Sequence, residues 1–415
     1  MSFDRLRVRM GHADDSGSTS HQKIGAPMTA NRWVVLAALF LARSALGFHF
    51  QSVASVSPLL VEDLGIDFTE VGTLIGFFSL LGVVTALPAG FLGQRFGERR
   101  GCILGLAMMA LGGLVMWLGD DFTVIGVGRI VAGTGGVIIT VLMVKIVGDL
   151  FEGREVVTAM AILMNSWPVG IALGLYTQGA MAEAWGWQAV FLTAGIGSFA
   201  GMLLIAILYR PAAKPVARAV QRLAITRSEA TKVSLAGIVW VLYNAGYLMV
   251  LSFGPAMLVV RGFDVAAAGL LIANATFVYM FAIPLGGWLS EKLARPNLVM
   301  VGCFAASALV IAIIPVVDAP LLLFILAAIF IGIPTGNVMA LTVETVRAEH
   351  RNTGTGLYHT WNHAGLFVGP ALAGWIVDQT GDPASAMFFG GAAVVLAIFV
   401  LGALRLVQRR EVLAG

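Results

Sequence analysis

The sequence predicts an all-α membrane protein with twelve transmembrane helices in two six-helix halves. Three observations support this fold class. First, 58% of the 415 residues are hydrophobic and only 12% are charged, whereas about a quarter of the residues in a soluble domain carry charge. Second, the chain divides into apolar runs that are long enough to cross a bilayer. Third, the turns between these runs alternate between basic and acidic composition.

The apolar runs follow a polar segment, residues 1–31, that lacks the apolar stretch of a signal peptide and is expected to be a disordered tail. Each run reaches the length of about 18 residues or more that ~30 Å of hydrocarbon requires at ~1.5 Å per residue. The predicted spans are 33–60, 69–93, 100–118, 123–148, 155–181, 187–209, 233–260, 265–290, 297–316, 320–345, 352–377 and 384–407.

The charges in the turns predict the orientation of the helices. Turns after the second, fourth, eighth and tenth spans are rich in arginine and lysine, and so is the segment 210–232. The turns at the opposite ends of the spans are acidic, and Arg261 is the only cation in them. Because cytoplasmic loops carry an excess of positive charge, we expect both termini and this segment in the cytoplasm. The expected setting is a bacterial-type inner membrane, with the lipid bilayer around the helices.

An internal repeat relates the two halves of the chain. An offset of 197 residues takes Gly90 to Gly287 and Asn165 to Asn362. A parallel duplication of this kind places a binding site near the bilayer midplane, between two halves that move against each other. The predicted domains are a cytoplasmic tail at 1–31, a six-helix half at 32–209, a cytoplasmic linker at 210–232, a six-helix half at 233–407 and a short tail at 408–415.

Glycine and arginine gather in one turn, GFLGQRFGERR, at residues 90–100. This turn resembles the signature of the major facilitator superfamily of transporters, commonly written G-x-L-x-D-R-x-G-R-R. Gln94 stands at the acidic position of that signature and Glu98 at a basic one. A degenerate copy follows at 287–296. The resemblance, which covers residues 33–407, implies a secondary transporter that works by alternating access.

The same turn is expected to act as a conformational latch. Its glycines allow a sharp turn, and its arginines can bridge to acids at neighbouring helix ends in one conformation only. The alternative, in which the arginines only fix the topology, stays open. The predicted latch residues are Gly90, Arg95, Gly97, Arg99, Arg100, Asp149, Gly287, Glu291 and Lys292.

Polar side chains inside the spans are the candidates for a binding site, because they are costly in hydrocarbon. Arg43 is predicted to bind the cargo, since it lies about ten residues into its span, far from either surface. Arg129 lies nearer the end of its span and either joins the site or braces helices. The predicted substrate-binding residues are Arg43, Gln51, Arg129, Asn165, Tyr243, Asn244, Asn337, His359, Asn362 and His363.

The spans contain no aspartate or glutamate near their middle. A cavity with arginine and without carboxylates attracts anions, and a guanidinium holds a carboxylate through two hydrogen bonds. The predicted cargo is therefore a small organic or inorganic anion. Histidine can carry a proton near neutral pH. Because of His359 and His363, two modes stay open, which are transport coupled to protons and exchange for a counter-anion. The first span is loosely similar to those of bacterial cyanate-transporter-like carriers, which does not fix the cargo.

Several classes of function are not expected. The histidines lack the further ligands of a zinc site, so neither a metal nor a cofactor is predicted, and the chain is not expected to be an enzyme. A net charge of +3 does not indicate nucleic acid, and the two cysteines are interpreted as small apolar residues of a monomer. The alternatives are a proton-coupled efflux pump for amphiphilic compounds and a non-transporting sensor or scaffold on the same fold.

Overall fold

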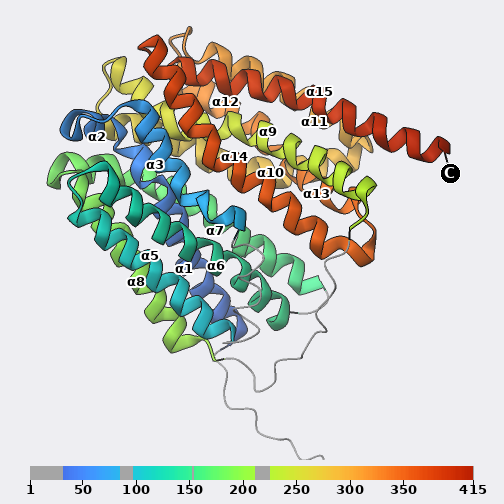
Figure 1. The fold of residues 1–415 in the computed structure, drawn as a ribbon, viewed down its shortest axis with the longest axis horizontal. Helices are drawn as coiled ribbons and strands as arrows, with labels where there is room; N and C mark the ends of the chain where they lie inside the picture. Colours follow the sequence, from blue (N-terminus) through green and yellow to red (C-terminus); the bar gives the residue numbers. More distant parts are fainter. Residues whose placement is uncertain (1–30, 85–96, 152–153, 211–224, 415) are drawn as a thin grey trace, which may run out of the picture.

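The computed structural model describes residues 31–84, 97–151, 154–210 and 225–414, which form helices joined by short turns (Figure 1). One group of helices, the N-terminal group, precedes residue 210, and the C-terminal group follows residue 225. The N-terminal group consists of α1 (Arg32–Ser55), α2 (Ser57–Leu64), α3 (Phe68–Leu80), α5 (Glu98–Leu118), α6 (Phe122–Leu150), α7 (Arg154–Trp185) and α8 (Trp187–Leu208). The C-terminal group consists of α9 (Arg227–Val260), α10 (Val265–Leu293), α11 (Pro296–Ile313), α12 (Pro320–Gly332), α13 (Thr335–Thr345), the 3-10 turn η1 (Ala348–His350), α14 (Arg351–Thr380) and α15 (Ser385–Ala414).

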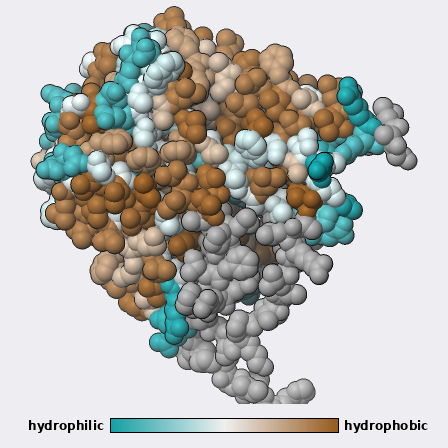
Figure 2. All heavy atoms as spheres, in the orientation of Figure 1, coloured by the Kyte–Doolittle hydropathy of each residue, from teal (hydrophilic) through white to brown (hydrophobic). Residues whose placement is uncertain are grey.

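The helices are those of a multi-pass membrane protein. Ten segments of the described chain are long and apolar enough to cross a membrane, with α12 and α13 counted as one. The other two of the twelve predicted spans are α3, whose described part ends at Val84, and α14. α14 is long enough to cross, but it is the least apolar of the long helices because it carries the predicted site residues His359, Asn362 and His363. Apolar side chains cover most of the face in Figure 2. The predicted fold class is therefore confirmed.

Each group has two ends, which the helices reach alternately. The linker end lies where α8 ends and α9 begins, and the distal end carries the short helix α2 and the turn that precedes α3. In Figure 1 the two groups lie close together near α2 and diverge toward the far ends of α8 and α15. The groups pack on each other mainly through two pairs of helices, α3 with α14 and α7 with α10.

Two of the predicted spans are broken near a proline. The first span is broken at Val56, because Pro58 cannot donate to the carbonyl of Ala54, and Ser57 Oγ donates to it at 3.0 Å instead. The span at 320–345 is broken at Pro334.

α9 begins at Arg227, inside the predicted linker. Its start is a capping box in which Thr226 and Glu229 satisfy each other's backbone N–H groups. α15 likewise continues past the predicted end of its span, to Ala414. The predicted domain boundaries thus remain predictions, with helix on both sides of residues 233 and 407.

Candidate functional site

Arg43 lies where α1 crosses α7 at very short range. Gly47 and Gly170 make this crossing possible, because a Cβ at Gly47 would lie 2.3 Å from the Trp167 carbonyl oxygen. A Cβ at Gly170 would lie 2.0 Å from the carbonyl oxygen of Ser44. Only glycine permits backbones to approach so closely. The crossing brings the guanidinium of Arg43 against the backbone of α7.

The guanidinium binds to a break in the hydrogen bonding of α7. Pro168 has no N–H to donate to the Met164 carbonyl one turn earlier. Nη1 of Arg43 donates to this carbonyl at 3.4 Å, to the Leu163 carbonyl at 3.0 Å and to Ser166 Oγ at 3.0 Å. The proline therefore creates the acceptor that holds the arginine, and the arginine satisfies the carbonyl that the proline leaves free.

The other edge of this guanidinium makes no hydrogen bond with the described residues. All of its hydrogen bonds come from Nη1, and Nε is buried without a partner among the described residues. The partners of Nη1 are neutral oxygens, so the positive charge is not compensated by a carboxylate. Arg43 keeps 6% of its surface accessible. The Nε–Nη2 edge of a guanidinium presents two parallel N–H donors, the arrangement that binds the two oxygens of a carboxylate.

Arg129 is a different kind of buried arginine. It is 0% exposed, and each of its nitrogens donates to a backbone carbonyl. Nε donates to Leu74 at 3.0 Å, Nη1 to His49 at 2.9 Å, and Nη2 to Phe50 at 3.2 Å and to Ile75 at 3.4 Å. Because the acceptors lie on α1 and α3, the side chain of α6 ties three helices together. This geometry favours the bracing alternative over contact with cargo.

Several predicted site residues of the C-terminal group hold its own helices together. Tyr243 on α9 donates to the Ile331 carbonyl and lies 2.7 Å from Thr335 Oγ1. Asn337 on α13 donates to Ser290 Oγ on α10 at 2.7 Å. These contacts are the hydrogen bonds expected between packed transmembrane helices.

The amides of Asn244 and Asn362 form a second polar spot, between α9 and α14. Nδ2 of Asn244 donates to Oδ1 of Asn362 at 3.2 Å. A small cavity beside them is also lined by Val241, Leu248 and Leu366. The remaining oxygen and NH₂ of the pair are neutral groups of the kind that hydrogen-bond hydroxyls.

The two histidines of α14 point to different surroundings. His359 is exposed, and its ring meets Trp240 edge to face at 5.2 Å. His363 is half-buried beside the residues that follow α3, where a Cβ at Gly82 would lie 2.5 Å from its Nδ1. This nitrogen has no partner among the described residues. His359 and His363 were predicted to share one face of the helix. That face places His363 beside the contact with the N-terminal group and leaves His359 exposed.

Gln51 and Asn165 were also predicted to bind substrate. Nε2 of Gln51 donates to the Leu251 carbonyl of α9 at 3.0 Å, so this side chain links the two groups. Asn165 donates to the Ala161 carbonyl of its own helix at 3.2 Å. Both assignments stay predictions, and neither side chain contacts Arg43 in the described structure.

The repeat offset that relates Asn165 to Asn362 does not hold where α7 and α14 contact the opposite group. There Gly179 corresponds to Gly374 and Glu183 to Asp378, because the two members of each pair make the same kind of contact with the opposite group. The offset at these positions is shorter by two. A difference of two residues turns a helix by about 200°, so Asn165 and Asn362 are not equivalent in the structure.

The predicted latch is only partly described. Gly90 and Arg95 lie outside the described residues. Gly97 begins α5 with φ of 82°, a value that favours glycine. Nη2 of Arg99 donates to the Ala206 carbonyl, and Arg100 is exposed.

The described ion pairs at this turn involve a lysine, Lys145. Lys145 binds both Glu98 and Asp149, the latter at 3.2 Å through the i,i+4 spacing. Glu98, which replaces a basic residue of the superfamily signature, thus pairs with a lysine. Asp149 was predicted to bridge to the arginines of the turn, but its described partner is Lys145. In the second copy Gly287, Glu291 and Lys292 are exposed, and Lys292 lies over the ring of Trp288 at 4.7 Å.

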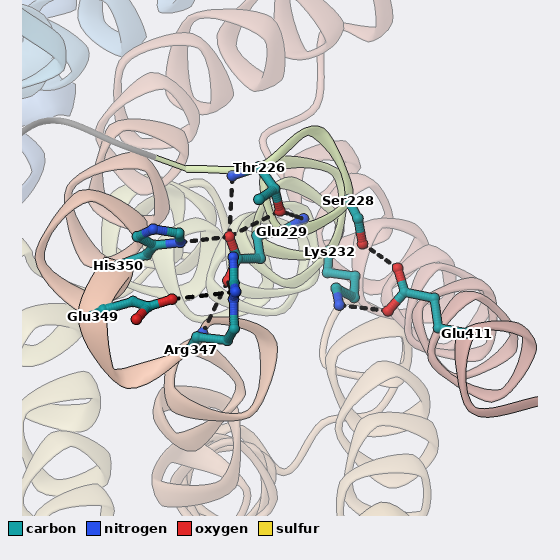
Figure 3. A network of polar contacts seen from close by, with 8 residues as sticks. All are labelled: Thr226, Ser228, Glu229, Lys232, Arg347, Glu349, His350 and Glu411. Carbon is teal, nitrogen blue, oxygen red and sulfur yellow. Dashed lines mark hydrogen bonds and ion pairs between the residues drawn. The ribbon is translucent and has the colours of Figure 1, made fainter. Parts of the chain in front are cut away.

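A polar network at the linker end was not predicted from the sequence. Figure 3 shows Glu229 at its centre, between the start of α9 and the η1 turn. The carboxylate accepts from Thr226, from the backbone N–H and Nε of Arg347 at 3.2 and 3.0 Å, and lies 2.7 Å from His350 Nδ1. The hydrogen bond that Arg347 donates raises the pKa of Arg347. The spacing of Thr226 and Glu229, which is that of a capping box, was the available signal.

We predict that Glu229→Gln lowers the free energy of unfolding by about 1–3 kcal/mol, because the donors around this buried carboxylate lose a charged acceptor. Thermal unfolding of the purified protein measures this loss. Glu411→Gln is the matched control, since Glu411 also pairs with a cation, Lys232 at 2.6 Å, but its side chain is 43% exposed and that of Glu229 only 5%. An exposed pair contributes about 1 kcal/mol at most. Equal effects of the two changes would contradict the prediction.

The described residues include no group of three or more histidine, cysteine or acidic residues with the geometry of a metal site. The buried arginines are charged groups held in fixed positions between transmembrane helices. The helices themselves form two groups, which contact each other mainly through two helix pairs.

Known proteins share this architecture. The bacterial homologue of the human lysosomal transporter Spinster, in an inward-facing and occupied conformation, superimposes with a TM-score of 0.73 at 17% identity, over 91% of this chain and 97% of that one. The hexuronate transporter of Bacillus subtilis is 23% identical over 88% of this chain and 92% of its own. The probable galactarate/D-glucarate transporter of the same organism is 24% identical over 89% and 91%.

The family assignment follows from a match over most of the chain. The model of the Major Facilitator Superfamily matches residues 39–365 and, separately, 235–414. This family and the similar proteins above are transporters rather than enzymes, as the sequence predicted. The resemblance that the glycine and arginine turn indicated is thus confirmed, and the chain belongs to the Major Facilitator Superfamily.

Proposed function

We propose that this protein is a secondary transporter of a small organic anion, and that Arg43 binds the carboxylate of the cargo through Nε and Nη2. The observation that carries the proposal is the one-sided anchoring of Arg43. Nη1 is held by three neutral acceptors, and the opposite edge has no partner for Nε in the described structure. A carboxylate at this edge compensates a charge that is costly to keep in the membrane.

The cargo we propose is a hydroxylated carboxylic acid. Two similar proteins are named for such compounds, hexuronate in one case and galactarate or D-glucarate in the other. The amide pair of Asn244 and Asn362 supports this class, since it offers both a donor and an acceptor to hydroxyl groups. Arg129 supports the site indirectly, because it holds α1 and α3 in place.

The proposed mechanism is alternating access with the distal end closed in this conformation. The hydrogen bonds between the two groups of described residues come from Gln51, Glu183 and Asp378, all toward the distal end. If basic turns face the cytoplasm, the linker end and both termini are cytoplasmic and this conformation is inward-facing. The setting we propose is the inner membrane of a bacterial-type cell, with a monomer as the transporting unit.

The coupling partner is proposed to be either a proton or a counter-anion. His363 is the residue that favours a proton, because its Nδ1 lies without a partner at the contact between the two groups. A counter-anion would use the same edge of Arg43 after the cargo has left. Uptake into proteoliposomes with and without a pH gradient distinguishes these two modes.

A thermal-shift titration of the purified protein tests the cargo class. D-glucuronate and D-glucarate are expected to raise the unfolding midpoint, since a ligand at about 100 times its Kd stabilises the folded state by about 2.7 kcal/mol. D-glucose is the matched control, because it keeps the hydroxyl groups and lacks the carboxylate. Stabilisation by an amphiphilic cation such as ethidium, without an effect of the acids, would contradict the proposal and favour an efflux pump.

A further inference from the structure

The distal end of the protein holds two side chains that cap helices of the opposite group. Asp378, near the end of α14, accepts hydrogen bonds from the backbone N–H groups of Phe68 at 2.9 Å and Thr69 at 2.7 Å, at the start of α3. The hydroxyl of Thr69 donates to the same carboxylate. The first N–H groups of a helix have no partner within it. A carboxylate from the C-terminal group therefore completes a helix of the N-terminal group.

The second cap runs in the reverse direction. Glu183, near the end of α7, accepts a hydrogen bond from the backbone N–H of Ala266 at 3.0 Å, at the start of α10. The N-cap residue of this helix, Asp264, makes no capping hydrogen bond with its side chain. Here the N-terminal group supplies a carboxylate to a helix of the C-terminal group. The positive end of each helix dipole adds to the attraction.

A glycine one turn before each carboxylate brings the helices together. A Cβ at Gly374 would lie 1.9 Å from the Phe68 carbonyl oxygen, and one at Gly179 would lie 2.8 Å from the Val265 carbonyl oxygen. Residues at i and i+4 share a helix face, so each glycine and the acid after it meet the same helix start. The sequences are GAMAE at 179–183 and GWIVD at 374–378. The two caps are thus copies of one device, related by the internal repeat.

We propose that Asp378 and Glu183 are the gate residues of the transport cycle, which hold the distal end closed by capping a helix of the opposite group. Alternating access requires the two groups to separate at this end. Separation breaks both caps at once and leaves the first turns of α3 and α10 without these acceptors. The cost of opening is therefore set by two helix caps, whichever compound is carried.

Alkylation of a cysteine at position 51 tests this gate in the full-length protein. Gln51 is 0% exposed and bonds to α9 across the two groups, so Gln51→Cys becomes reactive when they separate. The background also carries Cys303→Ala and retains Cys102, which is buried within the N-terminal group. Mass spectrometry after reaction with a charged maleimide, which adds the thiolate across its double bond, reports the two cysteines separately. Modification of Cys102 identifies unfolding, and modification of position 51 alone identifies opening.

Loss of one cap is expected to speed the alkylation of position 51 about fivefold, the ratio that corresponds to a typical helix cap. Asp378→Ala and Glu183→Ala should each do so, and the double variant should react about 25-fold faster, because distant sites act independently. Asp121→Ala is the matched control. Asp121 caps α6 of its own group, through Thr123 at 2.6 Å and Val124 at 2.9 Å, and its loss should leave the rate within about twofold.

A double variant that reacts at the parental rate would overturn the proposal. If the alanine variants expose Cys102, Asp378→Asn and Glu183→Gln are read instead, since they keep the side-chain volume and remove the charge. These variants should speed the reaction of position 51 at least about twofold. An unchanged rate in both, with Cys102 protected, would likewise reject the gate.

Discussion

Replacing Arg43 with glutamine is expected to weaken the binding of D-glucuronate at least about 100-fold. Two charge-assisted hydrogen bonds of about 1.5–3 kcal/mol each are lost, and about 2.7 kcal/mol already corresponds to that ratio. Arg43→Lys should retain weaker binding, because an ammonium keeps the charge and loses the planar pair of donors. Binding is measured by isothermal titration of the folded variants in detergent.

The matched control for Arg43 is another arginine that donates to backbone carbonyls. Arg261 lies in the turn between α9 and α10 and donates to the carbonyls of Ile314, at 3.1 Å, and Pro315. Arg261→Gln should leave the affinity unchanged, since this side chain lies at the distal end, away from the crossing of α1 and α7. Parental affinity in Arg43→Gln would restrict Arg43 to the second role that the structure supports, the bridging of α7 at Pro168.

Replacing Arg129 with methionine is expected to have the larger effect on stability. The change removes donors from four buried carbonyls and a cation from above the ring of Phe78, 4.7 Å away. Since these bonds tie α6 to α1 and α3, we expect a loss of about 3 kcal/mol or more in the free energy of unfolding. A thiol-reactive dye measures it, because Cys102 is buried and becomes reactive on unfolding.

Arg100→Met is the control for Arg129, because Arg100 is exposed and a substitution at the surface usually changes stability by about 0.5 kcal/mol or less. Arg129→Lys should fall between the two, since one ammonium cannot reach all the carbonyls that lie around the edges of the guanidinium. An unfolding midpoint of Arg129→Met equal to that of the parent would show that the brace contributes nothing.

The two arginines illustrate what could not be read from the sequence. Both lie in apolar spans and both were predicted to contact cargo, with bracing as the alternative for Arg129. The structure distinguishes them by their acceptors. Arg129 has a carbonyl for every nitrogen, whereas the hydrogen bonds of Arg43 to the described residues all come from Nη1. The signal for Arg43 was present as Pro168, which leaves a carbonyl free, but the proline does not say which neighbouring helix supplies the donor.

The internal repeat was visible in the sequence, but one offset does not relate all parts of the two halves. The offset that takes Gly90 to Gly287 also takes the start of α3 to the start of α10, whereas a shorter offset relates the distal parts of α7 and α14. Sequence identity at Asn165 and Asn362 therefore suggested an equivalence that the helices do not have. The acidic turns were assigned to one side of the membrane from their charge, and the capping of opposite helices by Glu183 and Asp378 became visible only from the contacts.

By itself the sequence determined the class of protein, the twelve spans and the family. These properties are local, since hydropathy over about 20 residues decides whether a segment suits hydrocarbon, and a signature turn is contiguous in the chain. The tertiary structure decided which side chains meet. A shift of one residue turns a helix by about 100°, so the partners of Arg43, Arg129 and Asp378 depend on how whole helices rotate and cross. Glycines such as Gly47 and Gly374 fix those crossings, because they set the distance at which two backbones pack.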